Sequence, residues 1–98
     1  MIRVRLPLHL QRLAGSGREV ELDLVGQVTP AAILDALEAR YPSLRGTLRD
    51  QLTHQRRDFI RFFACGEDFS LANPHTPLPE TIADGSQCFM IVGAMAGG

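Results

Sequence analysis

The stretch Thr29–Pro42, TPAAILDALEARYP, is the strongest helix signal in the chain. A threonine followed by a proline is typical of a helix start, because the threonine side chain caps free backbone N–H groups and proline suits the first helical position. Apolar residues recur at helical spacing from Ile33 to Leu37 and predict one buried face. Pro42 ends the helix at or before Tyr41, since the residue preceding a proline is pushed out of helical geometry. The stretch therefore predicts one amphipathic helix.

Two alternating segments precede this helix and predict a β-hairpin. Residues 2–6 alternate apolar side chains with arginine, and residues 19–24 alternate apolar side chains with glutamate and aspartate. Residues 15–17, Gly-Ser-Gly, are a turn signal between them. The charged residues that we expect to face one another across the outer side of this hairpin are Arg3, Arg5, Glu21 and Asp23.

The segments after the helix predict the rest of one small sheet. Leucines spaced four apart in residues 44–52 predict a short second helical segment. Residues 59–65 predict a third strand, residues 66–68 a turn, residues 69–71 a short fourth strand, and residues 88–92 the last strand. A single helix must then cover one face of the sheet, which predicts a two-layer α+β domain.

Strand parity divides the third and last strands into an inward and an outward face. If Ile60, Phe62 and Ala64 face the core, the residues between them point outward, and by the same rule Met90 and Val92 do too. Exposed apolar patches are typical of protein-binding surfaces, whereas the alternative is that the proline-rich loops fold over this face and bury it. Of the two interpretations we favour the partner surface. The residues of this predicted patch are Phe59, Phe63, Met90 and Val92.

The chain closes with Gly97-Gly98, after an apolar strand and a short connecting segment. Glycine has no Cβ, so its backbone can enter a narrow slot that other residues cannot. We expect residues 1–92 to form the domain and residues 93–98 to form a flexible tail. The alternative is a frayed end or a cloning scar. A Gly-Gly end predicts that the C-terminal carboxylate is presented to the active site of a partner enzyme.

Composition excludes several classes of protein. The 98 residues, 45% of them hydrophobic, suit one small domain, and the net charge of -1 gives no bulk attraction to nucleic acid. No apolar run is long enough to cross a membrane, and the alternating start is unlike a signal peptide, so we expect a cytoplasmic protein. All ten basic residues are arginine, so the chain has no lysine of its own to accept an isopeptide bond.

Cysteines and histidines give no sign of a metal site or of nucleophilic catalysis. Cys65 and Cys88 match neither a zinc pattern nor a Cys-x-x-Cys motif, and we expect free thiols that act as small apolar fillers. A redox-sensitive pair is the alternative if their strands are antiparallel neighbours. His9, His54 and His75 are far apart in sequence and are expected to be surface or loop residues.

Taken in order, these segments resemble the ubiquitin-like β-grasp sulfur carriers, which include the small subunit of molybdopterin synthase, the thiamine-pathway carrier ThiS and the cysteine-biosynthesis carrier CysO. The resemblance is carried by the helix ending in Arg-Tyr-Pro, by the strand and turn Phe59–Asp68, by the turn Thr81–Gly85 and by the ending Ala94–Gly98. The length of the chain is most similar to the CysO type. The resemblance implies a β-grasp fold, with a mixed sheet of four to five strands and one main helix on one face.

The resemblance also implies a chemistry for the C-terminus. Gly98 would bear a carboxyl group that an activating enzyme of the ThiF/MoeB kind adenylates with its own ATP and magnesium, and sulfur would then replace AMP to leave a thiocarboxylate. Met95, Ala96 and Gly97 would thread the channel of that enzyme. A sulfur-accepting synthase would use the sulfur to make cysteine, molybdopterin, thiamine or another metabolite, and a protease is a further possible partner that trims the C-terminus. The chain would be a carrier without an active site, a bound cofactor, a metal, or a nucleic-acid or membrane partner.

Two other functions fit the same residues, and three positions depart from the family pattern. The chain would alternatively be a ubiquitin-like modifier joined to target lysines through Gly98, or a β-grasp binding module without terminal chemistry. Cys65 replaces the usual asparagine of the turn, and Ser86 stands where a second acidic residue is common. Gly93 stands where proline is usual. Because proline would stiffen the exit of the tail, glycine is expected to loosen it.

Overall fold

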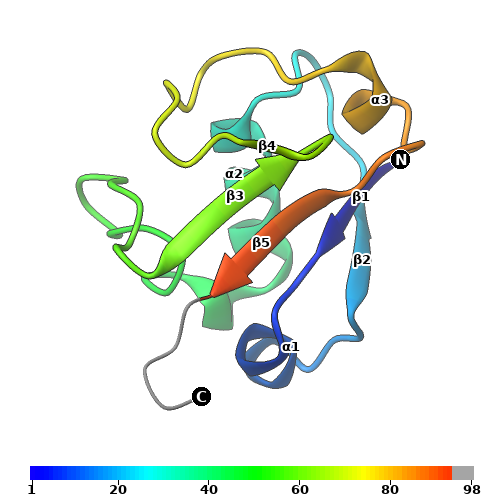
Figure 1. The fold of residues 1–98 in the computed structure, drawn as a ribbon. Helices are drawn as coiled ribbons and strands as arrows, with labels where there is room; N and C mark the ends of the chain where they lie inside the picture. The colour runs from blue at the N-terminus through cyan, green and yellow to red at the C-terminus, as the bar shows by residue number, and fades with distance from the viewer. Residues whose placement is uncertain (94–98) are drawn as a thin grey trace.

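The computed structural model describes residues 1–93, which form a single sheet with one long helix packed across it (Figure 1). The strand order is β2-β1-β5-β3-β4, with β1 and β5 parallel and the other neighbours antiparallel. The expected α+β fold, a mixed sheet with one main helix, is therefore confirmed. In chain order the elements are β1 (Ile2–Arg5), α1 (Leu8–Ala14), β2 (Glu19–Leu22), α2 (Pro30–Arg40), the 3₁₀ helix η1 (Pro42–Leu44), β3 (Ile60–Ala64), β4 (Glu67–Asp68), α3 (Glu80–Ala83) and β5 (Phe89–Gly93).

Helix α2 forms where the sequence predicts it. The Thr29 side chain accepts a hydrogen bond from the Ala32 backbone N–H at 3.1 Å, and Pro30 occupies the first helical position. Ile33 and Leu37 are fully buried against the sheet. The helix ends at Arg40, before Tyr41 and Pro42, as the proline requires.

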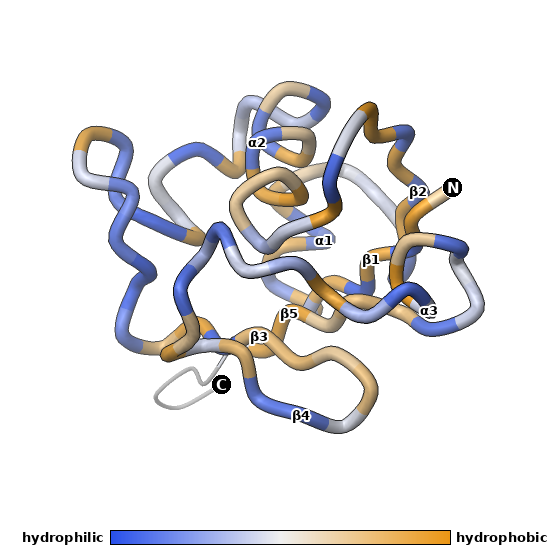
Figure 2. Tube along the Cα trace, turned by 90° about the horizontal axis from the view of Figure 1, so that it is seen from above, coloured by the Kyte–Doolittle hydropathy of each residue, from blue (hydrophilic) through white to orange (hydrophobic). Residues whose placement is uncertain are grey.

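The core lies between α2 and the inward residues of the strands. Figure 2 shows α2 on one side of the strands, with hydrophobic colour along β5 and most of β3. The rings of Phe62 on β3 and Phe89 on β5 pack in a tilted arrangement with their centroids 5.7 Å apart. The inward parity predicted for both strands is confirmed, since the buried residues of these strands are Ile60, Phe62, Ala64, Phe89 and Ile91.

Helix α1 replaces the plain hairpin connection that the sequence indicates between β1 and β2. The two strands pair in antiparallel fashion as predicted, but residues 8–14 between them are helical. Leu10 is buried in the core, and the Gln11 side-chain amide donates to the Leu6 carbonyl at 2.8 Å. Gly15 ends the helix in the left-handed conformation. Pro7 before the helix and Gly15 after it are the sequence signals for this helix.

The turn after β3 is tighter than predicted, and β4 lies earlier in the chain. Ala64 pairs with Glu67, so the turn consists of Cys65 and Gly66, both with positive φ. Such a two-residue turn matches the twist of the strands and returns the chain to the ladder at once. The predicted fourth strand at 69–71 is therefore wrong. Beyond β4 the Ser70 hydroxyl accepts a hydrogen bond from the Phe62 N–H. A side chain thus takes the place of a backbone partner for β3 at this position.

The segment between η1 and β3 is only partly helical. Leu44 and Leu48 are fully buried, as their spacing suggests, but Leu52 is exposed. Of the helical segment predicted over residues 44–52, only the end of the short helix η1 is helical in the structure. Arg49, which follows Leu48, is also buried. Its guanidinium donates to the Asp35 and Glu38 carboxylates and so ties this segment to α2.

Candidate partner-binding face

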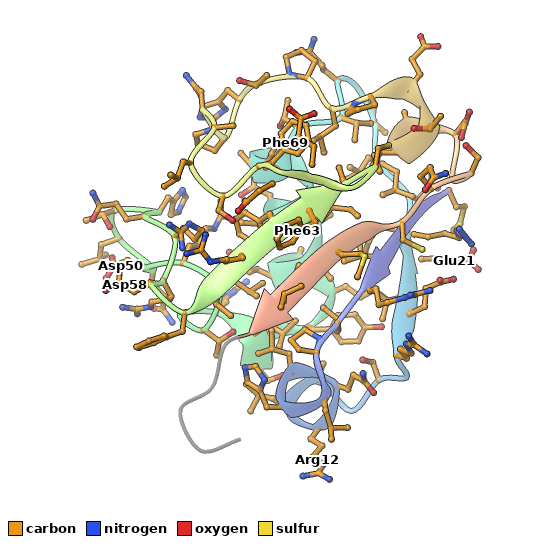
Figure 3. The ribbon with its side chains drawn as sticks, in the orientation of Figure 1. Arg12, Glu21, Asp50, Asp58, Phe63 and Phe69 are labelled. Atoms are coloured by element: carbon orange, nitrogen blue, oxygen red, sulfur yellow. The ribbon has the colours of Figure 1, made fainter. Side chains whose placement is uncertain are left out.

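The outward residues of β3 and β5 border a hollow on the sheet face opposite α2. Figure 3 shows Phe63 on β3 beside β5, on the side turned away from α2. Met90 and Val92 are 37% and 38% exposed, and Phe63 is half-buried. All three line a hollow of about 490 Å³. The described loops therefore leave these predicted patch residues open to a partner.

Phe59 is separated from the other residues of the predicted patch. It is 67% exposed and precedes β3, at the end of the sheet where Ile60 pairs with Gly93. It does not line the hollow. A shared binding role for Phe59 and Phe63 stays a prediction.

Two arginines that the sequence reasoning did not assign to this face also line the hollow. Arg3 and Arg5 point outward from β1, and each has a guanidinium nitrogen 4.0 Å from Oε1 of Glu19. The expectation that Arg3 and Arg5 face Glu21 and Asp23 holds in part. The register sets Arg3 opposite Glu21, but Arg5 lies opposite Glu19, and Asp23 lies beyond β2. Parity in β1 was the signal that both arginines point outward, and the parallel register then sets Arg5 opposite Met90.

The arginines leave unused hydrogen-bonding capacity at the hollow. Nε of Arg3 and Nε of Arg5 are buried and have no hydrogen-bond partner among residues 1–93. Two guanidinium groups share the one carboxylate of Glu19, which also accepts a hydrogen bond from Cys88. The hollow thus has a net positive lining with an apolar rim, which suits an acidic group on a partner.

Both cysteines lie beside the hollow and both are free thiols, as expected. Ala64 pairs with Phe89, so Cys65 and Cys88 flank the end of the β3–β5 ladder. Each sulfur contacts a different group: Cys65 Sγ lies 3.1 Å from the Thr81 hydroxyl, and Cys88 Sγ donates to Glu19 at 3.2 Å. Burial and the neighbouring Glu19 carboxylate raise the pKa of the Cys88 thiol.

The chain leaves the sheet at Gly93, the last residue of β5. Gly93 therefore belongs to the strand, although the sequence assigns it to the tail. His9 of α1 lies against it: a Cβ built on Gly93 would overlap Cε1 of the His9 ring and lie 3.2 Å from its Nε2. The predicted tail residues Met95, Ala96, Gly97 and Gly98 lie outside the described residues.

A second hollow, of about 510 Å³, lies on the other side of the molecule. It is bordered by the start of α2 and by the two loops that carry His54 and His75. The buried Arg49 at its wall is already paired with carboxylates, and Arg56 donates to backbone carbonyls of Ser70 and Ile60. This hollow therefore offers no side chain that identifies a ligand.

Residues 1–93 contain neither a cluster of metal ligands nor a helix that could span a membrane. In this part of the chain no three His, Cys, Asp or Glu side chains come together in a way that would hold a metal ion. None of the helices there is both long and apolar enough to cross a bilayer.

The strand order and the single helix across the sheet define the ubiquitin-like β-grasp fold. The sequence itself matches no family model and no curated protein. The structure matches SAMP1 from Haloferax volcanii with a TM-score of 0.76 and 25% identity, over 98% of this chain and 97% of that chain.

Two further matches are structures of CysO. The Amycolatopsis orientalis BexX/CysO complex matches with a TM-score of 0.77 and 22% identity, over 100% of both chains. CysO from Mycobacterium tuberculosis matches with a TM-score of 0.76 and 23% identity, over 97% of this chain and 100% of that chain. Residues 1–93 thus have the fold of these small β-grasp proteins.

Proposed function

We propose that this chain is a sulfur carrier whose Gly98 carboxylate is adenylated and then converted to a thiocarboxylate. The observation that carries the proposal is the full-length structural match to CysO combined with the Gly97-Gly98 ending. ATP would transfer AMP to the carboxylate with release of pyrophosphate. A sulfur nucleophile would then displace AMP and leave sulfur on the terminal carbonyl, ready for donation to an acceptor.

The partner in this proposal is an adenylating enzyme that binds the outer face of the sheet. CysO is known in complex with BexX, which supports a protein partner for a chain of this fold. Phe63, Met90 and Val92 supply an apolar contact, and Arg3 and Arg5 supply positive charge for an acidic residue of the enzyme. ATP and magnesium belong to the enzyme, and a sulfur-accepting synthase would follow as the second partner.

Intact mass spectrometry of the chain co-expressed with a candidate adenylating enzyme tests the terminal chemistry. We expect a mass rise that corresponds to one oxygen replaced by sulfur. A variant lacking Gly97 and Gly98 should show no such change while keeping the fold of residues 1–93. An unmodified wild-type chain, in the presence of ATP and an enzyme that is active on another carrier, would overturn the proposal.

A protein modifier is the second candidate, because SAMP1 is described as a small archaeal modifier protein. The same activation of Gly98 would then end in an amide bond to a lysine of a target. Since the chain has no lysine, a polymer of the chain on itself would need the amino group of Met1. Covalent adducts of higher mass, lost on deletion of Gly97-Gly98, would favour the modifier over the carrier.

A further inference from the structure

Helix α1, which connects β1 to β2, brings the His9 side chain to Gly93, where the chain leaves the sheet. Figure 1 shows α1 beside the end of β5, although the two are far apart in sequence. Helix α1 is held firmly there: Leu10 is buried in the core, and the Ser43 hydroxyl donates to the Leu13 carbonyl at 2.9 Å. His9, next to Leu10, is thereby fixed against Gly93.

The contact between His9 and Gly93 leaves no room for a side chain on residue 93 unless the His9 ring moves. An added Cβ would overlap Cε1 of the ring and lie 3.2 and 3.3 Å from Nε2 and Nδ1. Gly93 is not among the residues with positive φ, so its backbone conformation suits any residue. The His9 ring, rather than a special dihedral angle, is therefore what a side chain on residue 93 would meet.

We propose that His9 is a positioning residue that sets the direction in which the chain leaves β5. The ring packs on Gly93 and confines the exit from one side. Five residues follow Gly93, so the terminal carboxylate lies at most about 17 Å beyond it. The inference revises the expectation that glycine loosens the exit, since a neighbouring ring fills the space that the glycine leaves.

The effect of His9 on activation rests on the proposed function, but the contact itself does not. In the free protein, a ring seated on Gly93 should displace the NMR signal of one Gly93 Hα through its ring current. We expect this displacement to disappear in His9→Ala and to persist in His9→Phe, which keeps a flat ring. A Gly93 Hα signal that His9→Ala leaves unchanged would overturn the contact.

The functional experiment is a double-mutant cycle of His9→Ala and Gly93→Ala in the full chain. With His9 present, Gly93→Ala should raise KM for adenylation roughly tenfold, because a tail displaced at its exit should enter the enzyme less readily and bind more weakly. In the His9→Ala background, the same substitution should change KM less than about twofold, since the obstructing ring is gone. Leu13→Ala, on the exposed side of the same helix, is the control and should match wild type.

The outcomes of this cycle separate the inference from the proposed function. An equal effect of Gly93→Ala in both backgrounds would overturn positioning by His9, even with the ring-current shift present. A wild-type chain that no adenylating enzyme accepts would overturn the proposed function, while the ring-current measurement still decides the contact. A parallel loss of stability and KM in every variant would assign His9 a structural role only.

Discussion

The two faces of the sheet differ although the same strands build both. Phe89 on the inner face is fully buried, whereas Met90, the next residue of β5, is 37% exposed. Phe62 and Phe63 show the same contrast on β3. Because side chains alternate along a strand, stability depends on one residue of each adjacent pair, and the proposed partner binding depends on the other. Substitutions one position apart should therefore separate folding from binding.

The largest expected effect comes from breaking the inner face. Phe89→Ala removes a fully buried ring that packs on Phe62 and should lower the free energy of unfolding by about 3–5 kcal/mol. Met90→Ala, one residue away, should cost less than about 1 kcal/mol and instead weaken binding to the adenylating enzyme. Denaturant unfolding monitored by circular dichroism measures the first quantity and calorimetric titration the second. Similar losses of stability in both variants would contradict the division of the sheet into two faces.

A second comparison sets a buried arginine on the helix side against an exposed arginine on the outer side. Arg49 is buried and donates to Glu38, which is itself largely buried, so Arg49→Ala should lower the free energy of unfolding by about 2 kcal/mol. Arg61 and Asp68 form a pair that is exposed on both sides, and Arg61→Ala should cost less than about 0.5 kcal/mol.

The pKa of Asp68 gives the reason for that small value. Hydrogen bonds from Ser70 are the main cause that lowers the pKa of this carboxyl group, and Arg61 adds less. Loss of Arg61 therefore leaves most of the interactions of Asp68 in place. Thermal unfolding of the two arginine variants side by side measures the contrast. A larger loss of stability in Arg61→Ala than in Arg49→Ala would contradict it.

Local patterns made much of the fold predictable from the sequence. The cap and the spacing of α2 involve residues within one or two turns of each other, and strand parity needs only the alternation within β3 and β5. The outward exposure of Met90 and Val92 follows from that alternation once the inner face is known. The predictions for these elements were correct because each pattern depends on residues that are close together along the chain.

The features that the sequence did not predict depend on contacts between distant segments. Helix α1 has only seven residues, and its burial through Leu10 requires the rest of the core. The hollow combines Arg5 of β1 with Met90 of β5, which become neighbours only through the parallel pairing of these strands. His9 meets Gly93 for the same kind of reason. No local pattern links residues so far apart.

A smaller effect is expected at the turn that borders the hollow. Cys65 has a φ of 53°, a conformation that asparagine tolerates better than cysteine. Cys65→Asn should raise the free energy of unfolding by about 0.5–1 kcal/mol and leave the inner face unchanged. Thermal unfolding of this variant beside Glu67→Gln, a control on the neighbouring strand, tests the prediction. A lower stability of Cys65→Asn would show that the contact of Cys65 with Thr81 outweighs the backbone preference.

The smallest expected effect concerns only the reactivity of a thiol on the outer face. Burial first, and then the Glu19 carboxylate, raise the pKa of Cys88, so its thiolate is scarce near pH 8 and alkylation should be slower than at the exposed Cys65.

Glu19→Gln removes one cause of this raised pKa and releases Arg3 and Arg5 to attract the thiolate, so both changes lower the pKa of Cys88. Alkylation at Cys88 should accelerate several-fold at about pH 8, and the acceleration should fade as pH rises above the pKa of the wild-type thiol. Peptide mass spectrometry after timed alkylation measures each cysteine separately, with Glu21→Gln on the same strand as the control. Equal rates in the Glu19→Gln and Glu21→Gln variants would show that burial alone governs this thiol, and that the charges around the hollow do not reach it.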